Sequence, residues 1–383
     1  MTQTPGGFGL YLHWPFCQAK CPYCDFNSHV SANIDQARWQ AAYLSELDRA
    51  AAETKNRVLE TVFFGGGTPS LMDPSLVNAI IERIRQNWPM VNDPEISLEA
   101  NPTSVEAGRF AGYRDAGVNR ISMGIQALND TDLRRLGRMH SVKDARAAFD
   151  TARNLFDRVS FDLIYARQDQ TLEEWKAELT EALNMAIDHL SLYQLTIEDG
   201  TAFGARHAAG GLKGLPDDDT SADMYLLTQE ITAGAGLGSY EVSNHAREDA
   251  QSRHNLIYWR GGDYIGIGPG AHGRLTLNGQ KFATETELSP LGWLLNVEKK
   301  GSGETLRDLV PSSEQALEYL MMSLRLSEGT DLVRYRNLGG KLAQNAAQDL
   351  VQLGLIEIDE TRLRATSQGR PVLNGLLRNL IAE

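Results

Sequence analysis

The sequence holds three cysteines, and all of them lie in one short run, Cys17-Gln-Ala-Lys-Cys21-Pro-Tyr-Cys24. A disulfide framework needs an even number of cysteines and a structural zinc site takes four ligands, so neither fits this pattern. Soft thiolates in a tight loop suit an iron–sulfur cluster. A four-iron cluster on three thiolates keeps one iron open to a further ligand. The run therefore predicts a reactive [4Fe–4S] centre rather than a site for electron storage.

Further residues that could bind a ligand or react lie within apolar runs or near their ends. Glycines 65–67 let the backbone approach a ligand closely, although a tight turn is the structural alternative. Glu99 and Asp162 each have apolar neighbours, so each carboxylate needs a partner or a ligand, and Glu99 has the alternative of capping the next helix. The amide of Gln126 both donates and accepts, which suits the edge of an adenine or ribose.

The elements that must position these residues alternate regularly along the chain. Six β-rich apolar runs are each followed by an amphipathic stretch, which predicts an α/β fold of six βα units. Right-handed βαβ units curl such a sheet into a barrel or partial barrel, with ligands at the carboxyl ends of the strands. The expected strands are 10–14, 58–64, 95–100, 120–125, 159–165 and 189–195. The expected helices are 35–53, 74–86, 104–115, 130–136, 142–156, 172–186 and 221–233.

The pattern changes near Pro311. Short helices at 317–326, 331–338 and 341–353, two short strands and a last helix at 371–381 predict a winged-helix-like domain. Its basic and acidic residues are nearly balanced, which argues against DNA binding and for a cover or docking domain. We expect a partial barrel over residues 1–235, an extension that closes the site over 236–305, and a C-terminal domain over 306–383.

Composition limits the classes of function. The chain has 383 residues, of which 42% are hydrophobic and 23% charged, as expected of a globular protein. Its formal net charge of −13 argues against a nucleic-acid partner but leaves contact with a membrane surface open. The first residues predict no signal peptide, and no apolar run predicts a membrane span. Free thiolates require a reducing compartment, so the cytoplasm is the expected location.

The cysteine run and four flanking words resemble the radical S-adenosylmethionine (radical SAM) superfamily. The words are Tyr11-Leu-His-Trp-Pro-Phe-Cys17, Gly65-Gly-Gly-Thr-Pro-Ser70, Ser122-Met-Gly-Ile-Gln126 and Asp162-Leu-Ile-Tyr165. The resemblance implies a six-unit partial barrel, a [4Fe–4S] cluster on Cys17, Cys21 and Cys24, SAM at the open iron, and an electron donor such as flavodoxin or ferredoxin. The residues that it implies as SAM contacts are Tyr11, Tyr23, Gly66, Gly67, Thr68, Glu99, Gln126, Arg138 and Asp162.

Within that superfamily the words resemble the branch of oxygen-independent coproporphyrinogen III oxidase and the HemW-like haem chaperones. The oxidase has a fourth cysteine where this chain has Phe26, and a long arm ahead of the cysteines where this chain has a short segment. Both departures favour a haem chaperone that delivers haem to haem-requiring proteins, such as respiratory ones, and that lacks oxidase activity. The oxidative decarboxylase is the alternative. A transfer-RNA-modifying enzyme is a third class, which the acidic charge disfavours.

A second motif, His254-Asn-Leu-Ile-Tyr258-Trp259, offers a histidine beside two aromatic rings. Imidazole is a common ligand of haem iron, and aromatic rings can cover the edge of a flat macrocycle. The word resembles one associated with haem binding in HemW-like proteins, so His254 is the expected haem ligand. A hydrogen-bonded structural histidine is the alternative, and His13, His245 and His272 compete for the role. The turn at 266–270 is expected to close the SAM pocket.

Overall fold

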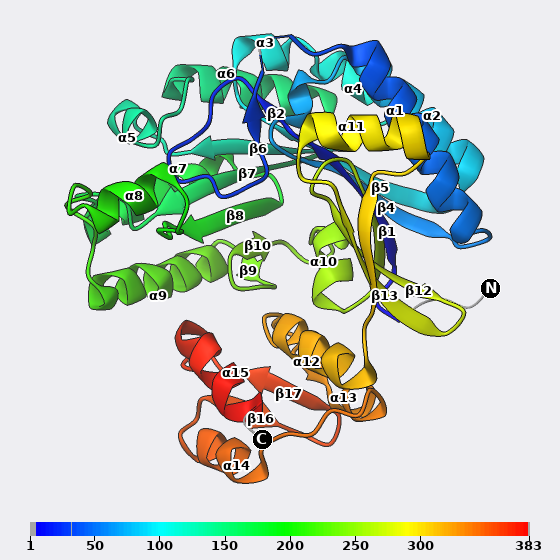
Figure 1. Cartoon of the computed structure of the whole chain (residues 1–383). Coiled ribbons are helices and arrows are strands. Elements are labelled where there is room, and N and C mark those ends of the chain that lie inside the picture. Colours follow the sequence, from blue (N-terminus) through cyan, green and yellow to red (C-terminus); the bar gives the residue numbers. More distant parts are fainter. Residues whose placement is uncertain (1–4, 32, 382–383) are drawn as a thin grey trace.

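The computed structural model describes residues 5–31 and 33–381, and a twelve-stranded sheet forms its centre (Figure 1). The six expected strands lie side by side in chain order and are parallel. The sheet curves without closing, because its two end strands are not paired with each other in the described chain. The six strands are β1 (Phe8–Trp14), β4 (Leu59–Gly66), β5 (Met90–Ala100), β6 (Arg120–Gln126), β7 (Arg158–Tyr165) and β8 (His189–Gln194).

The helices of the βα units cover the outer, convex face of the sheet, as the βα alternation predicts, whereas α8 (Ala202–Ala208), which was not predicted, projects from one end (Figure 1). The expected helix 104–115 is two helices, because Gly108 follows the first turn and glycine weakens a helix. Thr103 caps the first of them by accepting from the backbone N–H of Glu106. The helices are α1 (Gln36–Glu53), α2 (Pro74–Asn87), α3 (Ser104–Ala107), α4 (Phe110–Ala116), α5 (Asp130–Arg135), α6 (Val142–Leu155), α7 (Leu172–Met185), α8 (Ala202–Ala208) and α9 (Asp218–Gly234), with a 3₁₀ turn, η1 (Pro69–Leu71).

An aromatic cluster fixes the first strand against α1. Trp39 of α1 stacks on Trp293 with ring centroids 5.4 Å apart, and Trp14 and Tyr43 pack against the same group. The hydroxyl of Tyr43 donates to the backbone oxygen of His13 at 2.5 Å. These contacts hold the end of β1, and with it the start of the cysteine loop. That loop runs between β2 (Phe16–Cys17) and β3 (His29–Val30), which pair in parallel.

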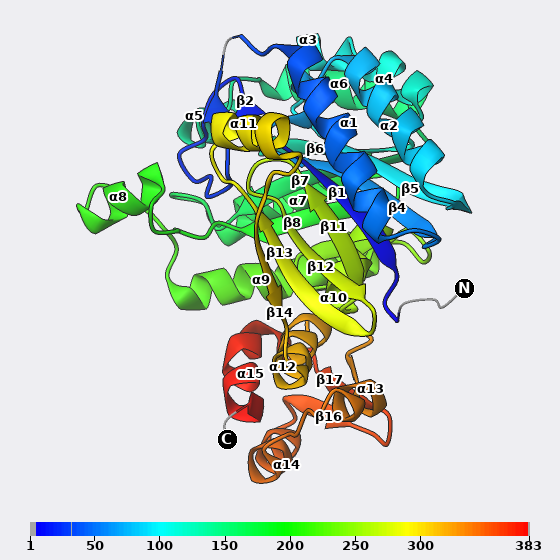
Figure 2. The ribbon, with the colours of Figure 1, turned by 45° about the vertical axis from the view of Figure 1, so that its right-hand side comes forward.

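The sheet continues into residues beyond 235, which the sequence patterns did not reveal. A seventh parallel strand, β11, pairs with β1, and three antiparallel strands follow it (Figure 2). Two short strands extend the other end of the sheet (Figure 1). The strands of the expected extension belong to the same sheet as those of the expected barrel. The three-way division of the chain stays a prediction. The added elements are β9 (Gly238–Ser239), β10 (Asn244–Ala246), α10 (Arg253–Trp259), β11 (Asp263–Ile267), β12 (His272–Leu277), β13 (Gln280–Thr286), α11 (Pro290–Lys300) and β14 (Glu304–Leu309).

The C-terminal part has its own hydrophobic core, separate from that of the barrel. It contains the short helices, the paired strands and the last helix expected from the sequence, and it lies below the sheet in Figure 1. Among the helices in the described part of the chain, none combines the length and the apolar character that crossing a bilayer requires. The elements are α12 (Ser312–Ser323), β15 (Thr330–Asp331), α13 (Leu332–Asn337), α14 (Gln344–Gln352), β16 (Ile356–Ile358), β17 (Arg362–Ala365), η2 (Arg370–Val372) and α15 (Leu373–Ile381).

Candidate functional site

One hydrogen bond closes a turn inside the cysteine loop, and another joins the loop to β1. The backbone N–H of Cys24 donates to the oxygen of Cys21 at 3.1 Å, which closes a tight turn. His13 Nε2 lies 2.9 Å from the backbone oxygen of Asn27, so this nitrogen must carry the proton. The other ring nitrogen of His13 therefore accepts from the hydroxyl of Tyr11, 3.0 Å away. His13 thus connects the loop to the first strand.

The turn at 266–270 supports the same loop from the side. The Asn27 amide donates to the backbone oxygens of Pro269 and Leu288, each at 2.9 Å. A Cβ on Gly270, which has φ +74°, would lie 2.5 Å from that amide nitrogen, so the close approach depends on glycine. None of residues 266–270 lines the cavity beside the cysteines. The turn supports the loop instead of closing the pocket.

A cavity of about 150 Å³ opens beside the loop, at the carboxyl ends of β4, β5 and β6. The structure gathers around it the predicted cluster and SAM residues except Tyr11. Phe26, which stands where the oxidase has its fourth cysteine, lines it as well. The predicted residues that line the cavity are Cys17, Cys21, Tyr23, Cys24, Gly66, Gly67, Thr68, Glu99, Gln126, Arg138 and Asp162.

Each of the three thiols has a polar neighbour. The hydroxyl of Thr68 donates to Cys17 Sγ and the guanidinium of Arg138 donates to Cys21 Sγ, both at 3.3 Å, while Cys24 Sγ lies 3.7 Å from a serine hydroxyl. Within residues 5–31 and 33–381, no three His, Cys, Asp or Glu residues are close enough to hold one metal ion.

Burial raises the pKa of the Cys17 thiol, and the neighbouring cysteines raise it further, against a hydrogen bond from Thr68 that lowers it. The thiol is therefore protonated before metal binds, and assembly of a cluster would release this proton.

Two carboxyl groups face the cavity opposite the cysteines. Burial raises the pKa of Glu99 to about 8, with the charge of Asp162 adding to the effect, although the N–H of Gly66 donates to it at 3.1 Å. Burial likewise raises the pKa of Asp162 to about 6, against a hydrogen bond from Ser191 that lowers it. Two acids that resist ionisation together form a site that a cation would stabilise. Glu99 caps no helix, which removes its structural alternative.

Arg138 joins the cysteine loop to the strand ends. Besides the contact to Cys21, its Nη2 donates to the side-chain oxygen of Asn101 at 2.5 Å and to the backbone oxygen of Gly124 at 2.8 Å. In the part of the chain that the structure describes, its buried Nε–H has no hydrogen-bond partner. An unpaired buried donor beside a cavity indicates a ligand with an acceptor oxygen.

Asn101 also belongs to this site, and the sequence patterns did not predict it. Besides accepting from Arg138, its amide donates to the Thr68 hydroxyl at 3.1 Å. It thereby connects the groups that contact Cys21 and Cys17. Its signal was the Asn-Pro pair directly after the third predicted strand, where a polar side chain ends an apolar run.

Backbone geometry supports the glycine run and Gln126 as site elements. Gly66 has φ +112°, and a Cβ there would lie 2.6 Å from the His13 ring, so the run passes close over this ring. A Cβ on Gly67 would lie 2.8 Å from the backbone oxygen of Phe16. Gln126 has φ +74°, which is unusual outside glycine and marks a residue that its surroundings hold in place.

Tyr11 and His254 lie in a second cavity, of about 220 Å³. It shares Glu99, Ser122 and Asp162 with the first cavity, so the two adjoin. Tyr11 points into this second space because its position on β1 turns it away from the cysteines. The structure therefore does not bring these two predicted residues together with the cluster loop.

Both ring nitrogens of His254 are engaged. Nδ1 lies 2.7 Å from the Thr61 hydroxyl and Nε2 lies 2.7 Å from the Tyr258 hydroxyl. Burial lowers the pKa of His254 to about 3, so the ring is neutral. Coordination of iron by His254 would require one of these bonds to break. Its role as a haem ligand stays a prediction.

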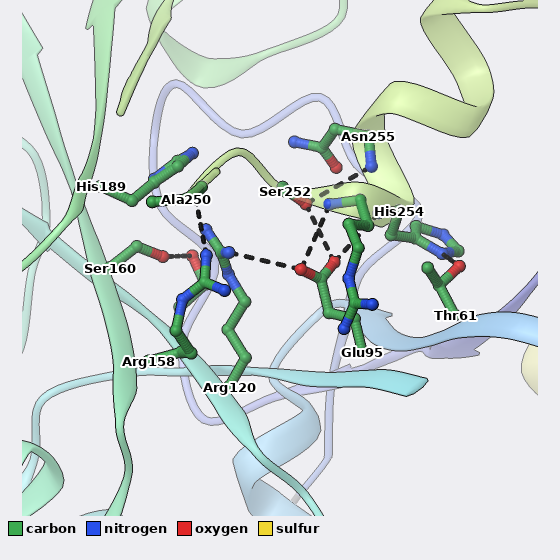
Figure 3. A network of polar contacts seen from close by, with 12 residues as sticks. Thr61, Glu95, Arg120, Arg158, Ser160, His189, Ala250, Ser252, His254 and Asn255 are labelled. Atoms are coloured by element: carbon green, nitrogen blue, oxygen red, sulfur yellow. Dashed lines mark hydrogen bonds and ion pairs between the residues drawn. The ribbon is translucent and has the colours of Figure 1, made fainter. Parts of the chain in front are cut away.

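The buried carboxylate of Glu95 fixes the helix that carries His254. It points at the first turn of α10 and accepts from the backbone N–H groups of His254 at 3.0 Å and Arg253 at 3.2 Å (Figure 3). The Ser252 hydroxyl donates to it at 3.4 Å, and the buried Arg120 guanidinium pairs with it at 3.4 Å. A carboxylate at a helix N-terminus compensates the unpaired N–H groups there.

We predict that Glu95→Ala lowers the free energy of unfolding by about 3 kcal/mol, because it leaves Arg120 and the start of α10 without their acceptor. Urea unfolding at fixed pH measures this. The matched control is Asp93→Ala, since Asp93 pairs with Arg253 at the surface and is 87% exposed, and it should cost below about 1 kcal/mol. Equal costs for both variants would contradict the assigned role of Glu95.

Comparison with known proteins gives consistent matches. The radical SAM superfamily matches residues 11–182, and the HemN C-terminal domain matches residues 310–372. Mitochondrial radical S-adenosyl methionine domain-containing protein 1 of Bos taurus is 38% identical over 97% of this chain and 87% of its own. Heme chaperone HemW of Escherichia coli (strain K12) is 37% identical over 98% of each chain.

Among solved structures, coproporphyrinogen III oxidase (HemN) from Escherichia coli superposes with a TM-score of 0.82 at 22% identity. The alignment covers 99% of this chain and 91% of that one. At this identity the likeness establishes the fold alone. It confirms the predicted α/β fold of radical SAM type with an added C-terminal domain.

Proposed function

The chain belongs to the radical SAM superfamily, in the group that contains HemW, and on this premise we propose that it binds haem and passes it to haem-requiring proteins. The observation that carries this proposal is the 37% identity to a protein named heme chaperone over 98% of both chains. Phe26 supports it, because the resembling oxidase has a fourth cysteine at this place. Acceptor apoproteins, an electron donor of the flavodoxin or ferredoxin kind and a reducing compartment follow from the proposal.

Membership of the superfamily implies a [4Fe–4S] cluster and SAM, and the residues that line the cavity beside the cysteines suit both chemically. Cys17, Cys21 and Cys24 would hold the cluster as thiolates. When bound, the cluster and SAM supply one-electron chemistry. The protein would contribute Thr68 and Arg138, whose hydrogen bonds to sulfur stabilise the thiolate form and tune the cluster potential.

The remaining groups of the cavity match the parts of SAM. Glu99 and Asp162 would accept from its ammonium group and offset its positive charge, because they are the acids that line the cavity. The unpaired Nε–H of Arg138 would donate to its carboxylate. The Gln126 amide would contact the nucleoside, as its combined donor and acceptor character suits. Tyr23 would cover the cluster from water.

We predict that SAM affinity rises by about tenfold per pH unit between pH 6 and 7.5. With its pKa near 8, Glu99 is protonated over this range and must lose a proton to hold a cation, so binding is tighter as pH rises toward that pKa. Calorimetry in two buffers of different ionisation enthalpy should show about one proton released at pH 6.5. Glu99→Gln should remove this proton release, and a pH-independent wild-type affinity would contradict the prediction.

Two assays on the cluster-reconstituted protein test the function. The first is oxygen-free turnover of coproporphyrinogen III with SAM and reductant, and the expected result is no protoporphyrinogen. The second is a haem titration followed by mixing with a haem-requiring apoprotein, and the expected result is a Soret band that moves to the acceptor. Product in the first assay would make the chain an oxidase. No haem binding in the second would overturn the chaperone proposal.

A further inference from the structure

A separate cavity, of about 190 Å³, lies at the seam between the barrel sheet and the C-terminal domain. The turn after α10 and strands β11 to β13 line one side, and α12 and α13 line the other. Figures 1 and 2 both show α12 beneath α10. The seam shares Tyr258 with the barrel cavity that contains His254, so one tyrosine separates the two spaces.

Positive charge is in surplus at this seam. Arg274 is matched by Glu318 at 2.9 Å, but Lys281 is 3.9 Å from the buried carboxylate of Asp263, which Arg57 already contacts at 2.9 Å. Lys281 instead donates to the backbone oxygen of Gly261 at 3.1 Å.

Arg334 adds to this surplus. It donates to the backbone oxygens of Arg260 at 2.5 Å and Gly261 at 2.8 Å, and among the described residues it has no carboxylate within ion-pair distance. In a chain with a net charge of −13, a seam lined by cations attracts anions.

The rest of the seam is aromatic and apolar. Tyr258 and Tyr264 meet edge to face with ring centroids 4.5 Å apart, and Tyr319 faces them from α12. Met321 also lines the seam and is 46% exposed. The same methionine lines an open apolar groove of about 480 Å³ between α12 and α15, beside Leu317. The seam therefore supplies cationic side chains, and the adjoining groove supplies an apolar surface.

We propose that the seam and groove together bind a flat apolar ring that carries carboxylates at one edge. Resting on the proposed function, the ligand is haem, with its two propionates toward Lys281 and Arg334 and its macrocycle against Met321 and Leu317. The charge and the apolar surface complement the two parts of such a ligand. Tyr258 lines the same seam and keeps its hydrogen bond to His254, so this placement uses neither nitrogen of His254 as an iron ligand.

The test uses the full chain with its cluster reconstituted, and the probes are haem, metal-free protoporphyrin IX and the dimethyl ester of protoporphyrin IX. Met321 lines both the seam and the groove, so Met321→Glu places a negative charge between the ring and its carboxylates, and Met321→Lys places a positive one there. Met321→Glu should weaken binding of haem and protoporphyrin IX about tenfold, and Met321→Lys should change it less than about threefold. Wild-type protein should prefer the free acid over the ester.

The control is Val333→Glu, on α13 outside the seam and 50% exposed, which should leave affinity unchanged. Melting curves within a few degrees of the wild type establish that each variant is folded. Haem binding that is equal in all variants would overturn the seam site while the haem-carrier function stands. A wild-type chain that binds neither haem nor protoporphyrin IX would overturn both. Equal affinity for acid and ester would overturn the carboxylate contacts.

Discussion

Cys21→Ala should abolish the iron–sulfur cluster, with iron after anaerobic reconstitution falling from about four atoms per chain to below about one. The chain has no fourth cysteine that could replace the lost thiolate. The variant also leaves the buried Arg138 without its sulfur acceptor. The guanidinium then lacks the negative partner that offsets its burial. Iron and sulfide analysis and the loss of brown absorbance measure the effect.

The matched control for this variant is Gln18→Ala, in the same loop. Gln18 is exposed and lies outside the cavity of about 150 Å³, lining only a smaller pocket on the other side of Cys21, so its loss should leave iron content within about a fifth of the wild type. Near-wild-type iron and sulfide in Cys21→Ala would remove Cys21 from the cluster. A loss of iron in both variants would point to general unfolding of the loop, which circular dichroism would reveal.

Glu99→Ala should weaken SAM binding by about thirtyfold or more, the second large effect that we expect. The carboxylate is buried at the cavity and is oriented by the N–H of Gly66. Charged hydrogen bonds of this kind contribute about 1.5–3 kcal/mol, and the loss also removes the charge that offsets a bound ammonium. Equilibrium dialysis of SAM against the cluster-loaded protein measures the affinity, and iron content should stay unchanged.

Asp25→Asn is the control for Glu99→Ala. Asp25 is an exposed acid in the cysteine loop that does not line the cavity, so its neutralisation changes the net charge without touching the site. SAM affinity should stay within about twofold of the wild type. Comparable losses in Asp25→Asn and Glu99→Ala would mean that SAM senses overall charge, and would contradict a direct contact to Glu99.

The positions of the main elements could be predicted from the sequence, because local patterns specify them. Each of the six parallel strands was placed within a few residues of its observed bounds, apart from the earlier start of β5 (Met90–Ala100), since apolar runs that are buried on both faces stand out in any window. Strands β11 to β14 were missed. Their side chains are a mixture of buried and exposed, and the partner of β11 is β1, some 250 residues earlier in the chain.

The gathering of the cavity residues was predicted for a similar reason. Parallel strands end at one edge of a sheet, so residues after successive strands must meet there, as Gly66, Glu99 and Gln126 do. The second cavity was not foreseen. Tyr11 lies on β1, inside the sheet. Which of the two cavities its side chain faces depends on the twist and register of the whole sheet.

The sequence by itself determined the thiol set, the βα order and the acids on the strands, since these follow from residue type and local spacing. Tertiary structure alone decided that both nitrogens of His254 are occupied by Thr61 and Tyr258, and that Lys281 and Arg334 meet at one seam. Hydrogen-bond partners and charge balance depend on atoms that are distant in sequence. They are fixed only when packing places those atoms within about 3 Å of each other.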